Sequence, residues 1–81
     1  MDMQRVEIID KVNEFLIEEF EIEESALGLD AHLIDDLGIE SLDFVDIVVT
    51  IEKEFGFKVK REEITEVRTL SDLYAYIEER A

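Results

Sequence analysis

Residues 35–44, DDLGIESLDF, hold the side chains whose types and spacing could do chemistry. Ser41 places a hydroxyl group among acidic residues, directly before an apolar run with helical spacing. A serine in that position could be a helix N-cap, a nucleophile, or an attachment point for a group that the chain does not encode. Each role needs different neighbours, so the surrounding residues must decide among them.

The nucleophile interpretation lacks its supporting parts. Ser41, His32 and Asp36 provide the residue types of a catalytic triad, but nothing in the sequence provides an oxyanion hole. A small helical bundle is also expected to lack the volume for a substrate pocket. His32 is the only histidine, cysteine is absent, and the acids around Gly38 do not have calcium-loop spacing. The sequence therefore predicts a protein that is not an enzyme and has no metal site.

The cap and attachment interpretations are compatible with the same position. Serine is a preferred N-cap residue, and Ser41 opens the apolar run. The N-terminus of a helix is also where a phosphate is best received, because unpaired N–H groups and the helix dipole both favour negative charge. Position alone leaves both roles open.

The charge distribution limits the kinds of partner. The net charge is -15, and no Lys or Arg lies between Lys11 and Lys53. Such a surface repels nucleic acid and anionic membranes, and complements basic protein surfaces. The first residues lack the pattern of a signal peptide, and no stretch is long enough to span a membrane. We expect one soluble, monomeric, cytoplasmic domain over residues 1–81, with the acidic run docking basic partners.

Apolar spacing predicts the flanking elements. Residues 6–20 have the period of a surface helix, with a buried stripe at Ile8, Val12, Phe15 and Leu16. Residues 21–40 lack a sustained period and predict a long loop with a short turn, anchored by Leu27, Leu29, Leu33, Ile34 and Leu37. Loops of that length are often functional.

The helix expected over residues 41–55 is apolar on two separate sides. One side should face the core and comprises Phe44, Ile47, Val48, Ile51 and Phe55. The opposite side has Leu42, Val45 and Val49 beside Asp43 and Asp46, which predicts an exposed apolar strip with acidic margins that a partner covers.

The C-terminal third predicts two further helical segments. Gly56 fits a helix C-cap, and residues 57–60 should be extended before a helical turn at 61–66 that buries Ile64. Thr69 and Asp72 have capping-box spacing ahead of a stripe formed by Leu70, Leu73, Tyr74 and Ile77. The fold class is all-α: a small up-and-down bundle of three main helices plus one short helix, without strands.

The motif DLGIESLD, residues 36–43, resembles the prosthetic-group site of acyl carrier proteins, whose usual pattern is D-L-G-x-D-S-L. The following FVDIVVTIEKEFGF, residues 44–57, is similar to the second helix of that family, and residues 69–77 are similar to its last helix. The resemblance extends over nearly the whole chain and agrees with the helix order expected from spacing.

The resemblance implies a carrier role. Ser41 would accept 4'-phosphopantetheine from coenzyme A through a separate phosphopantetheinyl transferase, and the thiol of the arm would carry acyl groups as thioesters between enzymes of fatty-acid or specialised lipid synthesis. Basic patches on the transferase and on acyl synthases or transferases would contact an acidic set of residues, and an apolar set would supply anchors for the same partners. The acidic set is Asp36, Glu40, Asp43 and Asp46, and the apolar set is Leu42, Val45 and Val49.

Two features depart from the family pattern. Glu40 stands where Asp is usual, and Phe44 is large at a core-facing position, where it would reshape the space that shelters an acyl chain. The SLDFVD run also resembles specialised carriers of long or hydroxylated chains for lipid A. Two alternatives remain: an aminoacyl carrier of the same fold, for peptide synthesis or D-alanine transfer, and an unmodified acidic adaptor.

Overall fold

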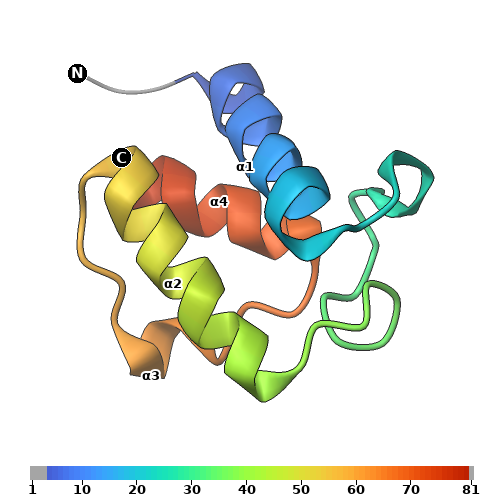
Figure 1. The fold of residues 1–81 in the computed structure, drawn as a ribbon. Helices are drawn as coiled ribbons and strands as arrows, with labels where there is room; N and C mark the ends of the chain where they lie inside the picture. Colours follow the sequence, from blue (N-terminus) through green and yellow to red (C-terminus); the bar gives the residue numbers. More distant parts are fainter. Residues whose placement is uncertain (1–3, 81) are drawn as a thin grey trace.

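The computed structural model describes residues 4–80, with position 41 described only by its place in a helix. The elements in chain order are α1 (Arg5–Phe20), the 3-10 turn η1 (Glu24–Ala26), α2 (Ser41–Phe55), α3 (Arg61–Ile64) and α4 (Leu70–Arg80) (Figure 1). The only β pairing among residues 4–80 is an isolated antiparallel bridge between His32 and Thr69. The all-helical prediction is therefore confirmed.

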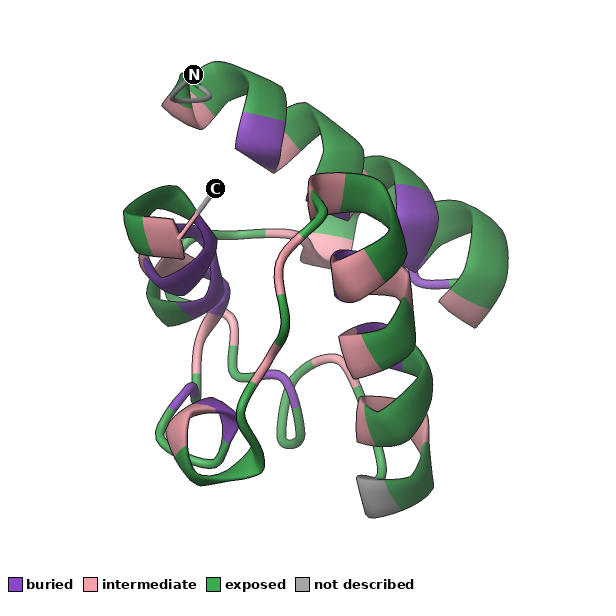
Figure 2. Ribbon diagram, turned by 90° about the vertical axis from the view of Figure 1, so that its left-hand side faces the viewer, coloured by how far each residue is buried: buried purple, intermediate pink, exposed green. Residues whose placement is uncertain are grey.

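The core forms where α1 packs against α4 and α2 (Figure 1). The predicted stripe of α1 is buried at all of its positions, and so is that of α4, which adds Tyr76 to the expected residues. Buried segments face the interior between helices in Figure 2, and exposed ones face outward. Each fully buried Leu or Ile contributes about 1.5–3 kcal/mol. The Tyr74 hydroxyl donates to Oδ1 of Asn13, which joins α4 to α1, and burial raises the pKa of Tyr74.

The predicted end of α2 at Gly56 is confirmed. Gly56 has φ of 75°, and its N–H donates to the carbonyl oxygen of Glu52 at 3.0 Å. Glycine takes this left-handed conformation without the steric cost that a Cβ brings. The chain is then free to turn into residues 57–60 and to reach α3.

The anchors of the long loop are only partly those expected. Leu33 is buried and Leu27 and Leu37 are half-buried, but Leu29 and Ile34 are 56% and 60% exposed, so their prediction as anchors is wrong. The missing anchors are Ile22 and Ile39, which are buried. Leu33 enters the core, whereas its neighbour Ile34 stays exposed and lines the pocket described below.

The residues expected on the core side of α2 are not equally buried. Ile47 and Ile51 are fully buried, whereas Phe44, Val48 and Phe55 are half-buried and pack against the core edge. The helical turn expected at 61–66 is present as α3, and it buries Ile64 with Val67 just beyond its end. Phe44 and Val48 also line the pocket described below, whereas Phe55 lies outside it.

Candidate functional site

Ser41 is the first residue of α2, and Glu40 is its N-cap. Glu40 has extended backbone, its N–H donates to Oδ2 of Asp43 at 3.2 Å, and its carbonyl oxygen accepts the N–H of Asp43 at 2.9 Å. The interpretation of Ser41 as the N-cap is therefore corrected by one residue. The carboxylate of Asp43 reaches back to position 40, which moves the helix boundary to Glu40 and leaves Ser41 at the first helical position.

Backbone hydrogen bonds fix where the chain enters α2. The N–H of Leu33 donates to the carbonyl oxygen of Arg68 at 2.9 Å, and the N–H of Ile39 donates to that of Leu33 at 3.0 Å. Gly38, with φ of 69°, makes the turn between these two buried anchors. The start of α2 is consequently tied to the segment that precedes α4.

The apolar strip predicted on the outer side of α2 is confirmed as exposed. Leu42 is 80% exposed, Val45 52% and Val49 57%. Three such side chains along one face of a helix form a continuous apolar surface. Leu42 and Val45 therefore do not pack under the preceding loop.

The predicted acidic residues lie in two places. Glu40, Asp43 and Asp46 belong to the start of α2, where Glu40 and Asp46 are exposed and Asp43 is half-buried in the capping contact. Asp36 lies in the preceding loop, and its Oδ2 accepts the backbone N–H of His32 at 2.8 Å. The carboxylates of Asp43 and Asp36 therefore accept backbone hydrogen bonds that stabilise the local structure. The carboxylate of Asp46 is exposed at the margin of the strip.

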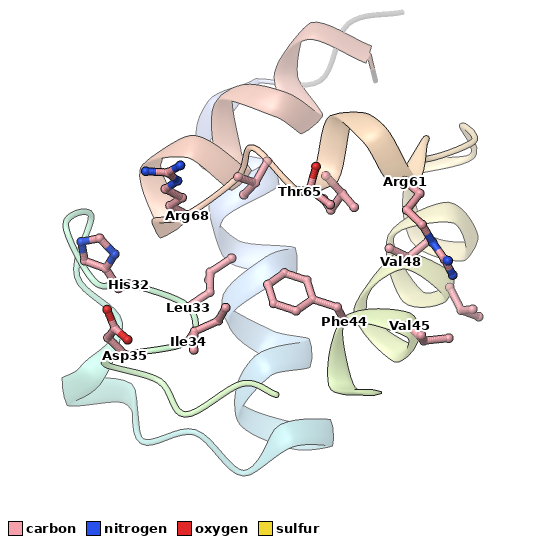
Figure 3. Close-up of a pocket in the computed structure, with 13 residues that line it drawn as sticks. His32, Leu33, Ile34, Asp35, Phe44, Val45, Val48, Arg61, Thr65 and Arg68 are labelled. Atoms are coloured by element: carbon pink, nitrogen blue, oxygen red, sulfur yellow. The ribbon is translucent and has the colours of Figure 1, made fainter. Parts of the chain in front are cut away.

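An open pocket of about 740 Å³ lies between α2, α3, residues 65–68 and the 32–35 loop (Figure 3). The expectation that the bundle lacks pocket volume is therefore wrong, because side chains of α2, α3 and two connecting segments enclose this space. The pocket is within the size range of small-molecule sites. Its lining residues are His32, Leu33, Ile34, Asp35, Phe44, Val45, Val48, Val49, Arg61, Ile64, Thr65, Val67 and Arg68.

Position 41 belongs to the helical face that borders this pocket. Residues three, four and seven positions apart share one face of a helix, so 41, 44, 45 and 48 form one row. Phe44, Val45 and Val48 of this row line the pocket, and the ring of Phe44 projects into its middle (Figure 3). A group attached at position 41 would therefore start at the end of α2 that borders the pocket.

The far wall of the pocket is held by contacts between α3 and α4. Nη2 of Arg80 donates to Oε2 of Glu63 at 2.6 Å, and the Tyr76 hydroxyl donates to Oε1 of Glu63 at 3.1 Å. The hydrogen bond from Arg80 lowers the pKa of Glu63, and the same pair raises the pKa of Arg80. These contacts fix α3, which has only four residues, against a long helix.

The start of α2 fits a phosphodiester. The helix has 15 residues, and the N–H groups of a first turn and the helix dipole favour an anion. The apolar pocket beside it suits a chain bound to that anion.

Among the residues that the structure describes, no group of three or more His, Cys, Asp or Glu side chains is placed to hold a metal ion. No helix in the described range is long and apolar enough to cross a membrane.

The sequence did not predict the pocket, although several of its lining residues were named in other roles. Ile34 was expected to anchor the loop, and Arg61, Thr65 and Arg68 were not singled out. The large Phe44 was the one available signal, because a bulky side chain there was expected to reshape an apolar space between helices. The remaining wall arises from the contact of segments that are distant in the sequence.

Comparison with known proteins defines the class. The family model described as a phosphopantetheine attachment site matches residues 10–77. The chain is 42% identical over 76 residues to an acyl carrier protein of Thermotoga maritima, covering 94% of each chain. It is 49% identical over 57 residues to the acyl carrier protein AcpXL of Rhizobium etli, covering 70% of this chain and 62% of that protein. AcpXL of Rhizobium meliloti is also 49% identical over 57 residues, with 70% and 60% covered.

The chain belongs to the acyl carrier protein family. Its cofactor is 4'-phosphopantetheine, and its function is to carry acyl groups. The prediction of the family, the fold and the cofactor is confirmed.

Proposed function

We propose that Ser41 is the residue that carries 4'-phosphopantetheine. The observation that supports it most strongly is its position: Ser41 begins α2 on the face whose next members, Phe44, Val45 and Val48, line the pocket. The DLGIESL motif, at residues 36–42, agrees with this assignment. When bound, the arm supplies the thiol that forms a thioester with the acyl group. The helix end favours the phosphodiester through its first-turn N–H groups.

The exposed face of α2 is the docking surface in this proposal. Leu42, Val45 and Val49 provide apolar contact area, and Glu40 and Asp46 provide charge at its margin, with Asp36 and Asp43 close by in sequence. The partners are a phosphopantetheinyl transferase and acyl synthases or transferases with basic patches. Long-range attraction accelerates encounter, and a small contact area permits rapid release, which suits a carrier.

The pocket is the place where the acyl chain is sheltered from water. Its apolar lining includes the buried Leu33, Ile64 and Val67, so a chain extended from the α2 end would contact side chains that already belong to the core. Phe44 and Val48 narrow the space from the α2 side. Residues 1–81 form one monomeric, non-catalytic carrier domain of the cytoplasm in this proposal, a view supported by a family match over most of the chain.

Intact mass measures the attachment directly. The unmodified protein is incubated with coenzyme A and a promiscuous phosphopantetheinyl transferase, and the wild type should gain the mass of one phosphopantetheine. Ser41→Ala should gain none, whereas Ser71→Ala, which changes a serine of α4, should behave as wild type. Modification of Ser41→Ala, or no modification of the wild type, would contradict the assignment.

A further inference from the structure

Two arginines line the pocket of a strongly acidic protein. The chain has 23 acidic and eight basic residues, yet two of the eight, Arg61 and Arg68, line this pocket. Among the described residues of the lining, Asp35 alone has a carboxylate. Figure 3 shows Arg61 on the side of Val45 and Val48 and Arg68 on the side of His32, with Phe44 between them. The pocket is therefore apolar in its middle and cationic at two places on its rim.

Neither arginine forms an ion pair with the described side chains, although backbone hydrogen bonds from Arg68 and Thr69, and to a smaller extent the charge of Arg68, lower the pKa of Asp72. Arg5 pairs with Glu78, and Arg80 pairs with Glu63 and Glu79. Within residues 4–80, no carboxylate oxygen lies within 4.0 Å of a side-chain nitrogen of Arg61 or Arg68. Both guanidinium groups are consequently available to a ligand.

The backbones that carry these arginines are nevertheless fixed. The carbonyl oxygen of Arg68 accepts the N–H of Leu33 at 2.9 Å, and its own N–H donates to Oδ2 of Asp72 at 3.3 Å. Arg61 opens α3, and its carbonyl oxygen accepts the N–H of Thr65 at 3.2 Å. The two cations are therefore presented from anchored positions, which reduces the conformational entropy lost when a ligand binds.

A guanidinium group recognises a carboxylate through paired N–H donors, and this recognition strengthens beside apolar surface. A purely apolar chain would fill the middle of the pocket and leave both cations without a partner. We propose that the pocket selects acyl groups whose free end is a carboxylate, and that Arg61 and Arg68 are the specificity-determining residues. This inference rests on the proposed attachment of the arm at Ser41 and deepens it by naming a substrate class.

The test compares two cargoes of equal carbon number. A promiscuous transferase loads the protein with either the octanoyl or the suberoyl group, which differ only in a terminal methyl or carboxylate. The rate of thioester cleavage by hydroxylamine is then measured for each, relative to the same acyl group on free pantetheine. Protection of the suberoyl thioester should exceed that of the octanoyl thioester roughly two- to fivefold, as expected for a partly exposed ion pair.

Variants assign the effect to the pocket. The double variant Arg61→Gln/Arg68→Gln should abolish the excess protection of the suberoyl thioester and retain the protection of the octanoyl thioester. The control Lys53→Gln removes one exposed positive charge of α2 outside the pocket lining and should behave as wild type. Single substitutions then show which arginine contributes more.

Several results would overturn the proposal. Equal protection of the two cargoes in the wild type would do so, and so would excess protection that survives in the double variant or disappears in Lys53→Gln. If the arginines instead bind the phosphodiester of the arm, the phosphorus NMR shift of the unloaded carrier would change in the double variant; the proposal predicts no change. Failure to load any acyl group would contradict the attachment at Ser41 itself.

Discussion

The starts of α2 and α4 use the same capping pattern with different residues. At α4, the N–H of Asp72 donates to Oγ1 of Thr69 at 3.2 Å, and the N–H of Thr69 donates to Oδ2 of Asp72 at 3.3 Å. At α2, the N–H of Glu40 donates to Oδ2 of Asp43 at 3.2 Å. The hydroxyl residue is the cap at α4, but at α2 the serine stands one position later.

The hydroxyl residue at the start of α4 stabilises its helix, whereas the one at the start of α2 is not the cap and is proposed as the attachment site. Thr69 uses its hydroxyl to satisfy a backbone donor of α4, so that oxygen contributes to the stability of the fold. Asp43 satisfies the N–H of Glu40 at α2, and the helix begins without Ser41 as its cap. The serine is therefore dispensable for the cap of α2, which is what an attachment site requires.

The largest effect is expected from charge reversal on the docking face. Asp46→Lys should slow modification by the transferase on the order of tenfold, because it removes attraction to a basic partner and adds repulsion. Asp46 is the residue to change because it is exposed. Substitution of Asp43 would also disturb the helix cap, since its carboxylate accepts the N–H of Glu40. The initial rate of phosphopantetheine transfer at low salt measures the effect.

The matched control is Glu14→Lys, which makes the same charge change on an exposed position of α1. Its rate should stay within about twofold of wild type, because exposed charges beyond a Debye length are screened. Equal slowing by both variants would show that net charge, and not the face of α2, governs the encounter.

The next effect concerns the cap of α4. Thr69→Ala should lower the free energy of unfolding by about 1 kcal/mol, because the N–H of Asp72 loses its acceptor. Urea unfolding followed by circular dichroism measures this loss, and the rate of modification of the folded protein should be unchanged. A variant as stable as wild type would show that the hydroxyl contributes nothing to the cap.

The pH dependence of stability tests the contribution of the Asp72 carboxylate to the same cap of α4. Backbone N–H groups of Arg68 and Thr69 hold the pKa of Asp72 below its ordinary value of 3.8. Its contribution to stability is therefore fully present above that value and is lost as the pH falls through the lower folded pKa. The difference in melting temperature between wild type and Asp72→Asn should shrink as the pH falls below 3.8. A constant difference would exclude ionisation of Asp72 as its cause.

The smallest effect is expected at Glu40. Glu40→Asp retains the charge and the backbone bonds of the cap, and Asp is a favoured N-cap residue. Stability should not fall, and the rate of modification should stay within about twofold of wild type, as expected for a surface substitution that conserves charge. A large change in rate would show that the transferase reads the length of this side chain.

The helices were predictable from the sequence because their apolar residues repeat with a helical period. Ile8 and Val12 in α1 and Ile47 and Ile51 in α2 are buried as expected. The loop offered no period, so Ile34 could not be told apart from the true anchor Ile39. Helix ends depend on individual side-chain hydrogen bonds. The N–H of Glu40 donates to the carboxylate of Asp43, so the N-cap of α2 is Glu40, one residue before the Ser41 considered from the sequence.

The site was predictable only in part for a related reason. The exposed strip of α2 follows from the same helical period, so Leu42 and its neighbours were placed correctly. The pocket depends on long-range contacts, such as the hydrogen bond from Leu33 to Arg68, that no local pattern encodes. The position of Arg61 and Arg68 in the pocket lining could consequently be found only from the structure.

The most direct test of the difference between the two helix starts is the free energy of unfolding of unmodified Ser41→Ala. We predict a value within about 0.5 kcal/mol of wild type, because Glu40 caps α2 and alanine is a strong helix former. A loss of about 1 kcal/mol or more, equal to that expected for Thr69→Ala, would show that Ser41 stabilises the helix start and would contradict the separation of stability from chemistry.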